Sequence, residues 1–283
     1  MDLTEAEIRG FVRTALAEDV AEGDVTTLAT VPAEARAQAF IRAREPLVLA
    51  GIAVAEAVFN ELSPAIKMER AARDGQSLEA GATLLQLAGP ARPLLAGERV
   101  ALNFLQRLSG VATLTARFVE AIKGTRARLL DTRKTTPGLR RLEKYAVVCG
   151  GGTNHRSGLY DMVLIKDNHL AALKGETPNA IAAAITRARR QYPDLKIEVE
   201  ADTLEQVEQA LAAGANLILL DNMNLQQLRT AVGVCAGRAA TEASGGVNLD
   251  SARAIAETGV DFISVGALTH SARAVDIGLD FEL

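Results

Sequence analysis

Cysteine is scarce in this chain of 283 residues. Cys149 and Cys235 lie far apart, without a CxxC pair or a run of histidine and cysteine at metal-ligand spacing. This pattern argues against a disulfide framework or structural zinc and favours a reducing compartment. The chain also lacks the run of about 18 uncharged apolar residues that a membrane span needs. Its acidic, amphipathic beginning is not typical of a signal peptide. We therefore expect a soluble, cytoplasmic protein with no membrane partner.

An excess of positive charge is missing too. The 35 Asp and Glu residues outnumber the 31 Lys and Arg residues, which leaves a net charge of −4. Nucleic-acid binders are usually basic overall, so we expect no nucleic-acid partner. Because 48% of the residues are hydrophobic, the chain can bury a sizeable core, and this excludes a disordered protein.

Two familiar catalytic motifs are absent. The chain has no G-x-S-x-G elbow and no recognisable Cys-His pairing, which disfavours nucleophilic hydrolase chemistry. It also has no G-x-G-x-x-G fingerprint after its first strand in the second half, so nicotinamide-dependent dehydrogenation loses its main support.

The first hundred residues show no regular alternation of strands and helices. Segments 37–44 and 46–51 are typical of strands, and residues 52–62 of a helix. A long helical pattern follows over residues 98–123, and Ser109-Gly110 interrupts it. These patterns predict an α+β domain with its own small core.

In the second half, apolar strands alternate with helices. The expected strands cover residues 127–131, 161–166, 196–200, 216–221, 238–244 and 261–266, and the expected helices 178–191, 204–213, 225–234 and 249–258. Such alternation indicates parallel βαβ units, in a closed barrel or an open doubly wound sheet. Polar residues or a glycine end successive strands, which favours a barrel because barrel enzymes place their chemistry there. These residues are Lys166, Glu200, Asp221, Glu242 with Ser244, and Gly266.

Positive charge is concentrated within one segment of this acidic chain. Residues 126–174 carry a net charge of +6. A solvated helix face is the favoured interpretation of Arg140, Arg141 and Lys144. It does not explain the basic residues in loops or at strand ends, which suit carboxylates and phosphates and predict a small polyanionic ligand. They are Arg133, Lys134, Arg156 and Lys166.

Two glycine-containing turns follow consecutive strands, at residues 243–246 and 264–267. Barrels often hold a phosphate on backbone N–H groups in this region. Glu200 and Asp221 are the carboxylates left for chemistry. They could ligate Mg²⁺ together with phosphate oxygens, stabilise positive charge developing on a substrate, or pair with a neighbouring lysine for structure alone.

Eight blocks of this sequence resemble the quinolinate phosphoribosyltransferase family almost end to end. The most specific are DTRKTTPGLRRLEKYAV (131–147) and GGGTNHRSGLYDMVLIKDNH (150–169). The others are EDVAEGDVTT (18–27), AGERVALNFLQRLSGVAT (96–113), IEVEAD (197–202), LLDNM (219–223), EASGGV (242–247) and SVGALTHS (264–271).

The resemblance implies an α/β protein with an open or incomplete (β/α) TIM-like barrel preceded by an α+β N-terminal domain. We expect the N-terminal domain at residues 1–108, joined by the C-terminal tail 272–283, and the barrel with the phosphoribosyl-binding site at 109–271. It also implies a homodimer, or an assembly of dimers, with shared active sites.

The implied reaction joins quinolinate to 5-phosphoribosyl-1-pyrophosphate, giving nicotinate mononucleotide, CO2 and pyrophosphate in de novo NAD biosynthesis. Mg²⁺ is the implied cofactor, bound via Glu200 and Asp221, and no prosthetic group is needed. The alternatives are a paralogue of this family associated with molybdate transport, the monocarboxylate enzyme nicotinate phosphoribosyltransferase, and a non-catalytic barrel that binds phosphorylated metabolites.

The resemblance also implies a role for each matching residue. Lys134, Lys166, Glu200 and Asp221 are the implied catalytic residues. Substrate binding adds Arg99 (from the partner subunit), Thr132, Arg133, His155 and Arg156, of which Arg133, Arg156 and Lys166 would hold the quinolinate carboxylates. The 5-phosphate would lie on Ser244, Gly245, Gly246, Val265, Gly266 and Ala267.

Overall fold

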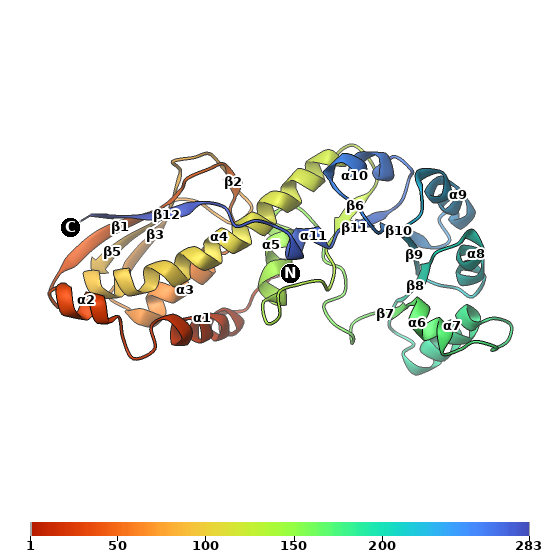
Figure 1. Cartoon of the computed structure of the whole chain (residues 1–283), viewed down its shortest axis with the longest axis horizontal. Coiled ribbons are helices and arrows are strands. Elements are labelled where there is room, and N and C mark those ends of the chain that lie inside the picture. Colours follow the sequence, from red (N-terminus) through yellow and green to blue (C-terminus); the bar gives the residue numbers. More distant parts are fainter. Residues whose placement is uncertain (1, 283) are drawn as a thin grey trace. The chain divides into compact units, whose positions relative to one another are not determined.

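The computed structural model describes residues 2–282. Two compact units make up the chain, and Figure 1 labels their elements. Of the described residues, the first unit comprises 2–116, 136–151 and 271–282, and the second comprises 117–135 and 152–270. The expected boundary at residues 108 and 109 falls within a helix of the first unit. Residues 136–151, which we assigned to the barrel domain, group with the first unit.

The first unit is built on a four-stranded antiparallel sheet in the order β12-β1-β5-β3. The C-terminal strand β12 pairs with β1, so the tail joins this unit as expected. Buried and less buried residues alternate along β1, the pattern of a sheet with one face on a core. The strands are β1 (Arg36–Ala43), β2 (Leu47–Val48), β3 (Lys67–Arg70), β4 (Ser77–Leu78), β5 (Thr83–Pro90) and β12 (Ile277–Glu282). The helices are α1 (Glu5–Asp19), α2 (Val25–Thr30), α3 (Ile52–Leu62), α4 (Ala91–Ala121) and α5 (Arg140–Cys149).

Helix α4 runs without a break, so the interruption expected at Ser109-Gly110 is wrong. Ser109 is buried, and its hydroxyl accepts a hydrogen bond from the Ala50 amide at 3.1 Å. Gly110 lies against the Arg273 carbonyl, and a Cβ at this position would collide with that oxygen. The two residues therefore allow other segments to pack closely against the helix rather than end it.

The solvated face expected on α5 is also wrong for one residue. Lys144 is fully buried, whereas Arg141 forms an ion pair with Glu7 at 2.8 Å. A basic residue on an amphipathic helix was interpreted as solvent-facing, but α5 packs on several sides within the first unit.

The second unit contains a six-stranded parallel sheet in the order β6-β11-β10-β9-β8-β7. All six expected strands are present: β6 (Arg128–Leu130), β7 (Val163–Ile165), β8 (Ile197–Ala201), β9 (Leu217–Asp221), β10 (Ala240–Ser244) and β11 (Phe262–Ser264). The end strands β6 and β7 are not neighbours in the sheet, so the barrel is open, as expected. The sequence thus predicted both the strands and the incomplete closure.

Helices follow the strands of this unit, and the residues that begin them explain where they start. Asn179, Thr203, Asn224 and Asn248 each accept backbone hydrogen bonds as N-caps of the four longer helices. The helices are α6 (Asp167–Ala171), α7 (Ala180–Gln191), α8 (Leu204–Ala212), α9 (Leu225–Cys235), α10 (Leu249–Ala256) and α11 (Ala267–His270). Among the described residues, no helix is long and apolar enough to cross a membrane.

Candidate active site

A cavity of about 540 Å³ lies within the second unit, where the strands of the open barrel end. It brings together eleven of the residues expected from the sequence, drawn from loops and from the carboxyl ends of strands. They are Thr132, Arg133, Lys134, His155, Arg156, Lys166, Glu200, Asp221, Ser244, Gly245 and Gly246.

Four expected residues do not line this cavity. Arg99 is exposed on α4, within the first unit. Val265 is buried, Ala267 begins α11, and Gly266 lies beside the aliphatic part of the Lys134 side chain. The phosphate-binding roles of the last three stay predictions.

Two arginines of the cavity lie close enough to influence each other. Burial, and then the charge of Arg133, lowers the pKa of Arg156. The Arg156 guanidinium also donates to the Met162 carbonyl at 3.4 Å. Because like charges are held together here, an anion bound between them would relieve their repulsion. The arrangement therefore suits a ligand with negative charge.

Lys166 and Glu200 meet across neighbouring strands. The Lys166 ammonium donates a hydrogen bond to Glu200 Oε2, and the Glu200 side chain is only 12% exposed. The sequence left open the alternative that Glu200 pairs with a neighbouring lysine for structure alone, and this ion pair is such a contact. Both side chains also line the cavity, so the same contact can hold them ready for a substrate.

Asp221 is held by the turn that follows β9. The Asn222 amide donates to Asp221 Oδ2 at 2.7 Å, and Asn222 itself adopts a left-handed backbone with φ of 53°. Gly245, with φ of 98°, lies so close to Asn222 that any Cβ would collide with the Asn222 side chain. Gly245 is thus required for the close approach of two neighbouring turns.

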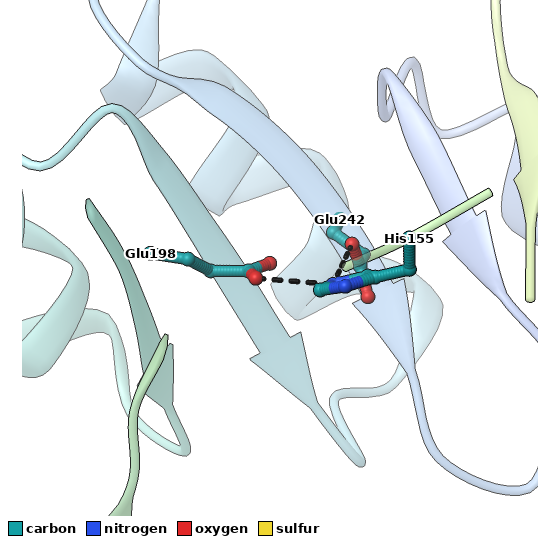
Figure 2. A group of neighbouring side chains, drawn as sticks. All are labelled: His155, Glu198 and Glu242. Carbon is teal, nitrogen blue, oxygen red and sulfur yellow. Dashed lines mark ion pairs between the residues drawn. The ribbon is translucent and has the colours of Figure 1, made fainter. Parts of the chain in front are cut away.

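Three side chains form a buried cluster that the sequence did not reveal. His155 Nε2 lies 3.1 Å from Glu198 Oε2 and 3.4 Å from Glu242 Oε2. Figure 2 marks both ion pairs with dashed lines. Both carboxylates are at most 1% exposed, and their oxygens have no other hydrogen-bond partner among the described residues. Glu198 is two residues before Glu200 on β8, so the alternation of a strand places both on one face, and this was the available signal.

The cluster holds protons more firmly than its separate members would. Burial lowers the pKa of His155, but the hydrogen bonds and charges of Glu198 and Glu242 outweigh this effect and raise it to about 10. Burial, and then the charge of Glu242, raises the pKa of Glu198. Buried groups that interact this strongly titrate as a set.

The cluster does not fit a metal ion, although its ligand atoms all lie within 4.8 Å of one another. The two carboxylates raise the pKa of His155 to about 10, so Nε2, the atom that faces them, carries a proton at neutral pH. A protonated Nε2 has no lone pair with which to bind a metal.

A buried aspartate positions the segment that carries His155. Asp131 accepts hydrogen bonds from the Asn154 side chain at 2.6 Å and from the His155 amide at 2.8 Å. No separate role was expected for Asp131 from the sequence. Its position directly after β6 explains why the 154–156 segment can present side chains to the cavity.

A second cavity of about 520 Å³ opens on the opposite, amino-terminal side of the strands. Arg128, Lys196 and Phe262, which lie at or next to the starts of strands, contribute to its lining. His155, Arg156 and Glu242 line both cavities.

Two family models together match most of the chain. The N-terminal domain of quinolinate phosphoribosyl transferase matches residues 24–109, and the C-terminal domain of the same family matches residues 111–280. The chain belongs to the quinolinate phosphoribosyl transferase family.

Individual members of the family agree over nearly the full length. The chain is 46% identical to a nicotinate-nucleotide pyrophosphorylase [carboxylating] of Mycobacterium leprae, over 96% of each chain. It is 43% identical to a probable enzyme of the same name from Bacillus subtilis, covering 94% of this chain and 90% of that protein. The solved nicotinate-nucleotide pyrophosphorylase of Francisella tularensis superposes with a TM-score of 0.93 at 40% identity, covering 99% of this chain and 98% of that one. The open barrel and its companion unit are therefore the family's fold.

Proposed function

We infer that this protein is a phosphoribosyltransferase that converts quinolinate and 5-phosphoribosyl-1-pyrophosphate to nicotinate mononucleotide, CO2 and pyrophosphate, in de novo NAD biosynthesis. Its family and its relatives, named carboxylating nicotinate-nucleotide pyrophosphorylases, support this activity. The observation that carries the inference is the cavity of the open barrel, which combines clustered cations with two carboxylates at strand ends.

Quinolinate has two adjacent carboxylates, which match the charge of this cavity. We propose that Arg133, Arg156 and Lys166 bind them, since guanidinium forks suit carboxylates and Lys166 adds a compact charge. A dianion would also offset the repulsion that lowers the pKa of Arg156. His155 lies at the same wall of the cavity, with Nε2 directed at Glu198 and Glu242.

In the first chemical step, the pyridine nitrogen attacks the anomeric carbon of the ribose while the bond to pyrophosphate breaks. Positive charge develops on the sugar ring, and Glu200 and Asp221 are proposed to stabilise it. Lys134 and the Thr132 hydroxyl would face the phosphates, and the turn at Ser244, Gly245 and Gly246 would hold the 5-phosphate. The proposed 5-phosphate contacts also include Val265, Gly266 and Ala267.

In the second step, the carboxylate next to the ring nitrogen leaves as CO2. The electron pair of the broken bond stays on the ring carbon, where the adjacent positive nitrogen stabilises it until a proton replaces CO2. The ring itself is thus the electron sink, and no prosthetic group is proposed.

Magnesium is the proposed cofactor. Glu200 and Asp221 supply oxygen donors of the kind that Mg²⁺ prefers, and both line the cavity. Glu200 is paired with the charged Lys166 ammonium, whereas Asp221 accepts a hydrogen bond from the neutral Asn222 amide, so Asp221 keeps more of its negative charge for a cation. When bound, Mg²⁺ would neutralise charge on the leaving pyrophosphate.

We propose the same oligomeric state and cellular location that the sequence led us to expect. A homodimer, or an assembly of dimers, would allow Arg99 of one subunit to reach the site of another. A cytoplasmic location is proposed from the scarcity of cysteine.

Relatives and solved structures of the family support the transferase rather than the alternatives, a molybdate-associated paralogue or a non-catalytic barrel. The test is an assay of the purified protein with quinolinate, 5-phosphoribosyl-1-pyrophosphate and Mg²⁺, followed by chromatography of nicotinate mononucleotide and by release of labelled CO2. The matched control is Lys134→Ala, which should lose activity without unfolding. A folded wild-type protein that forms no nicotinate mononucleotide would refute the proposal.

A further inference from the structure

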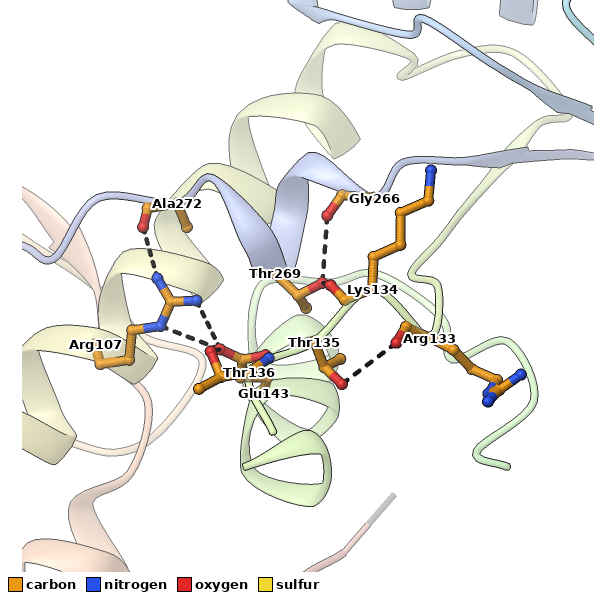
Figure 3. A network of polar contacts seen from close by, with 9 residues as sticks. All are labelled: Arg107, Arg133, Lys134, Thr135, Thr136, Glu143, Gly266, Thr269 and Ala272. Atoms are coloured by element: carbon orange, nitrogen blue, oxygen red, sulfur yellow. Dashed lines mark hydrogen bonds and ion pairs between the residues drawn. The ribbon is translucent and has the colours of Figure 1, made fainter. Parts of the chain in front are cut away.

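Hydrogen bonds hold the segment Thr132–Thr136, which carries Lys134. They lie on both sides of a crossing, a point where the chain passes from one unit to the other. The chain leaves the barrel unit between Thr135 and Thr136. It crosses again between His270 and Ser271. Residues next to both crossings take part in the contacts shown in Figure 3.

On the side of the first unit, a buried carboxylate holds Thr136. Glu143 is fully buried in α5 and accepts a hydrogen bond from the Thr136 amide at 3.0 Å and another from its hydroxyl at 2.8 Å. Arg107 of α4 donates to the same carboxylate from Nε at 3.2 Å and from Nη2 at 2.6 Å. Its third nitrogen, Nη1, donates to the Ala272 carbonyl at 2.7 Å. One ion pair thus fixes the backbone just after each crossing.

On the side of the barrel unit, a buried hydroxyl holds Lys134. Thr269 donates to the Lys134 carbonyl at 2.7 Å. The Lys134 amide donates to the Thr132 hydroxyl at 3.1 Å, and the Thr135 amide donates to the Arg133 carbonyl at 3.0 Å. The peptide that carries the Lys134 side chain is therefore fixed from both ends.

We propose that Arg107 and Glu143 are positioning residues for Lys134. Glu143 restrains Thr136, two residues from Lys134, and the guanidinium of Arg107 holds that carboxylate in place by a two-nitrogen fork. Only arginine can make this fork and still donate to the Ala272 carbonyl. Neither residue lines the barrel cavity, so their effect on the reaction passes through the backbone of this segment.

The test combines Glu143→Gln with Lys134→Ala in a double-mutant cycle. In the wild-type background, Glu143→Gln should lower kcat/KM for 5-phosphoribosyl-1-pyrophosphate about tenfold, because small misplacements of a catalytic group cost much of its effect. In the Lys134→Ala background the same change should alter the residual kcat/KM, measured at high enzyme concentration, by no more than about twofold. An equal loss in both backgrounds would show a general structural role and overturn the proposal.

The matched control is Arg141→Gln, which removes the ion pair with Glu7 from the same helix. It should leave kcat/KM unchanged. If Glu143→Gln does not fold, Arg107→Lys and Arg107→Ala replace it, and the lysine variant should retain more activity than the alanine variant. Equal activity of these two would count against the fork.

Hydrogen exchange separates this inference from the proposed function on which it rests. Amides of residues 132–136 should exchange faster in Glu143→Gln than in the wild type or in Arg141→Gln, whatever reaction the protein catalyses. Unchanged exchange there refutes the positioning role. An inactive wild-type protein with faster exchange in the variant would refute only the transferase assignment.

Discussion

Replacing His155 by alanine should destabilise the protein strongly, for a reason unrelated to substrate binding. The imidazole is the ion-pair partner of both Glu198 and Glu242, and both carboxylates are at most 1% exposed. Without it, two buried carboxylates face each other with no other hydrogen-bond partner among the described residues.

Breaking a buried ion pair on one side costs about 3–5 kcal/mol. For a unit of this size, such a loss corresponds to a fall in melting temperature of about 10 °C. Adding Glu198→Gln and Glu242→Gln to His155→Ala removes the stranded charges, so the triple variant should regain at least half of the loss.

The pH dependence has a definite sign. The two carboxylates raise the pKa of His155 from 6.5 to about 10, so folding favours the protonated imidazole. Its contribution to the free energy of unfolding is complete below pH 6.5, falls as the pH rises and is lost above about 10. The difference in stability between the wild type and His155→Ala should therefore narrow from neutral pH toward pH 10.

Calorimetry at pH 7 and 9 measures both effects, with His270→Ala, an exposed histidine, as the control. A melting temperature of His155→Ala within about 1 °C of the wild type at pH 7 would refute the reasoning, since such a shift is far below that of a broken buried pair.

Three further outcomes follow from the proposed function. Nicotinic acid, which has one carboxylate fewer than quinolinate, should react with a much lower kcat/KM, because each unpaired buried group costs roughly 1–3 kcal/mol; comparable values would contradict the proposed cation set. Lys166→Ala should mainly weaken quinolinate binding. Glu200→Ala should lower kcat by roughly 10²–10³, while calorimetry shows a nearly unchanged affinity for quinolinate. Abolished binding with normal turnover in Glu200→Ala would speak against a role of Glu200 in the transition state. Mixed Arg99→Ala and Lys134→Ala subunits should recover activity in hybrid dimers, and continued inactivity despite proven exchange would argue against a shared site.

The sequence predicted the open barrel well, because short apolar runs and helix caps mark each βα unit. All six expected strands exist, although β7 and β11 are shorter than the expected segments 161–166 and 261–266. The apolar residues Met162 and Val265 lie directly next to these two strands, so composition alone overextends a strand.

Predictions from the sequence were wrong at positions whose surroundings depend on packing between distant segments. The sequence predicted that Ser109 and Gly110 interrupt a helix, but both residues contact segments that lie far away in the sequence. Lys144 was predicted to be solvated because its helix is amphipathic. Its burial becomes evident only in the folded structure.

In the candidate site, too, some residues could be predicted from the sequence and others depend on packing. Charged residues in loops or at strand ends could be found from the sequence, and six of them line one cavity: Arg133, Lys134, Arg156, Lys166, Glu200 and Asp221. Glu198 shares a strand face with Glu200, and Glu242 was expected only as a residue near a strand end, so neither indicated a buried cluster with His155. Arg107 and Glu143 act through the backbone of another segment, which no motif describes.

The open edge of the barrel sheet restricts how this protein can evolve. An unpaired strand edge offers N–H and C=O groups to other chains and favours aggregation. Thr153 covers the edge of β6: its amide donates to the Leu129 carbonyl at 2.8 Å, and its own carbonyl accepts from the Asp131 amide at 3.2 Å. The next three residues are Asn154, His155 and Arg156, two of which line the cavity. Insertions in this segment would uncover a sheet edge as well as move the site, so its length should be far less variable than that of an ordinary surface loop.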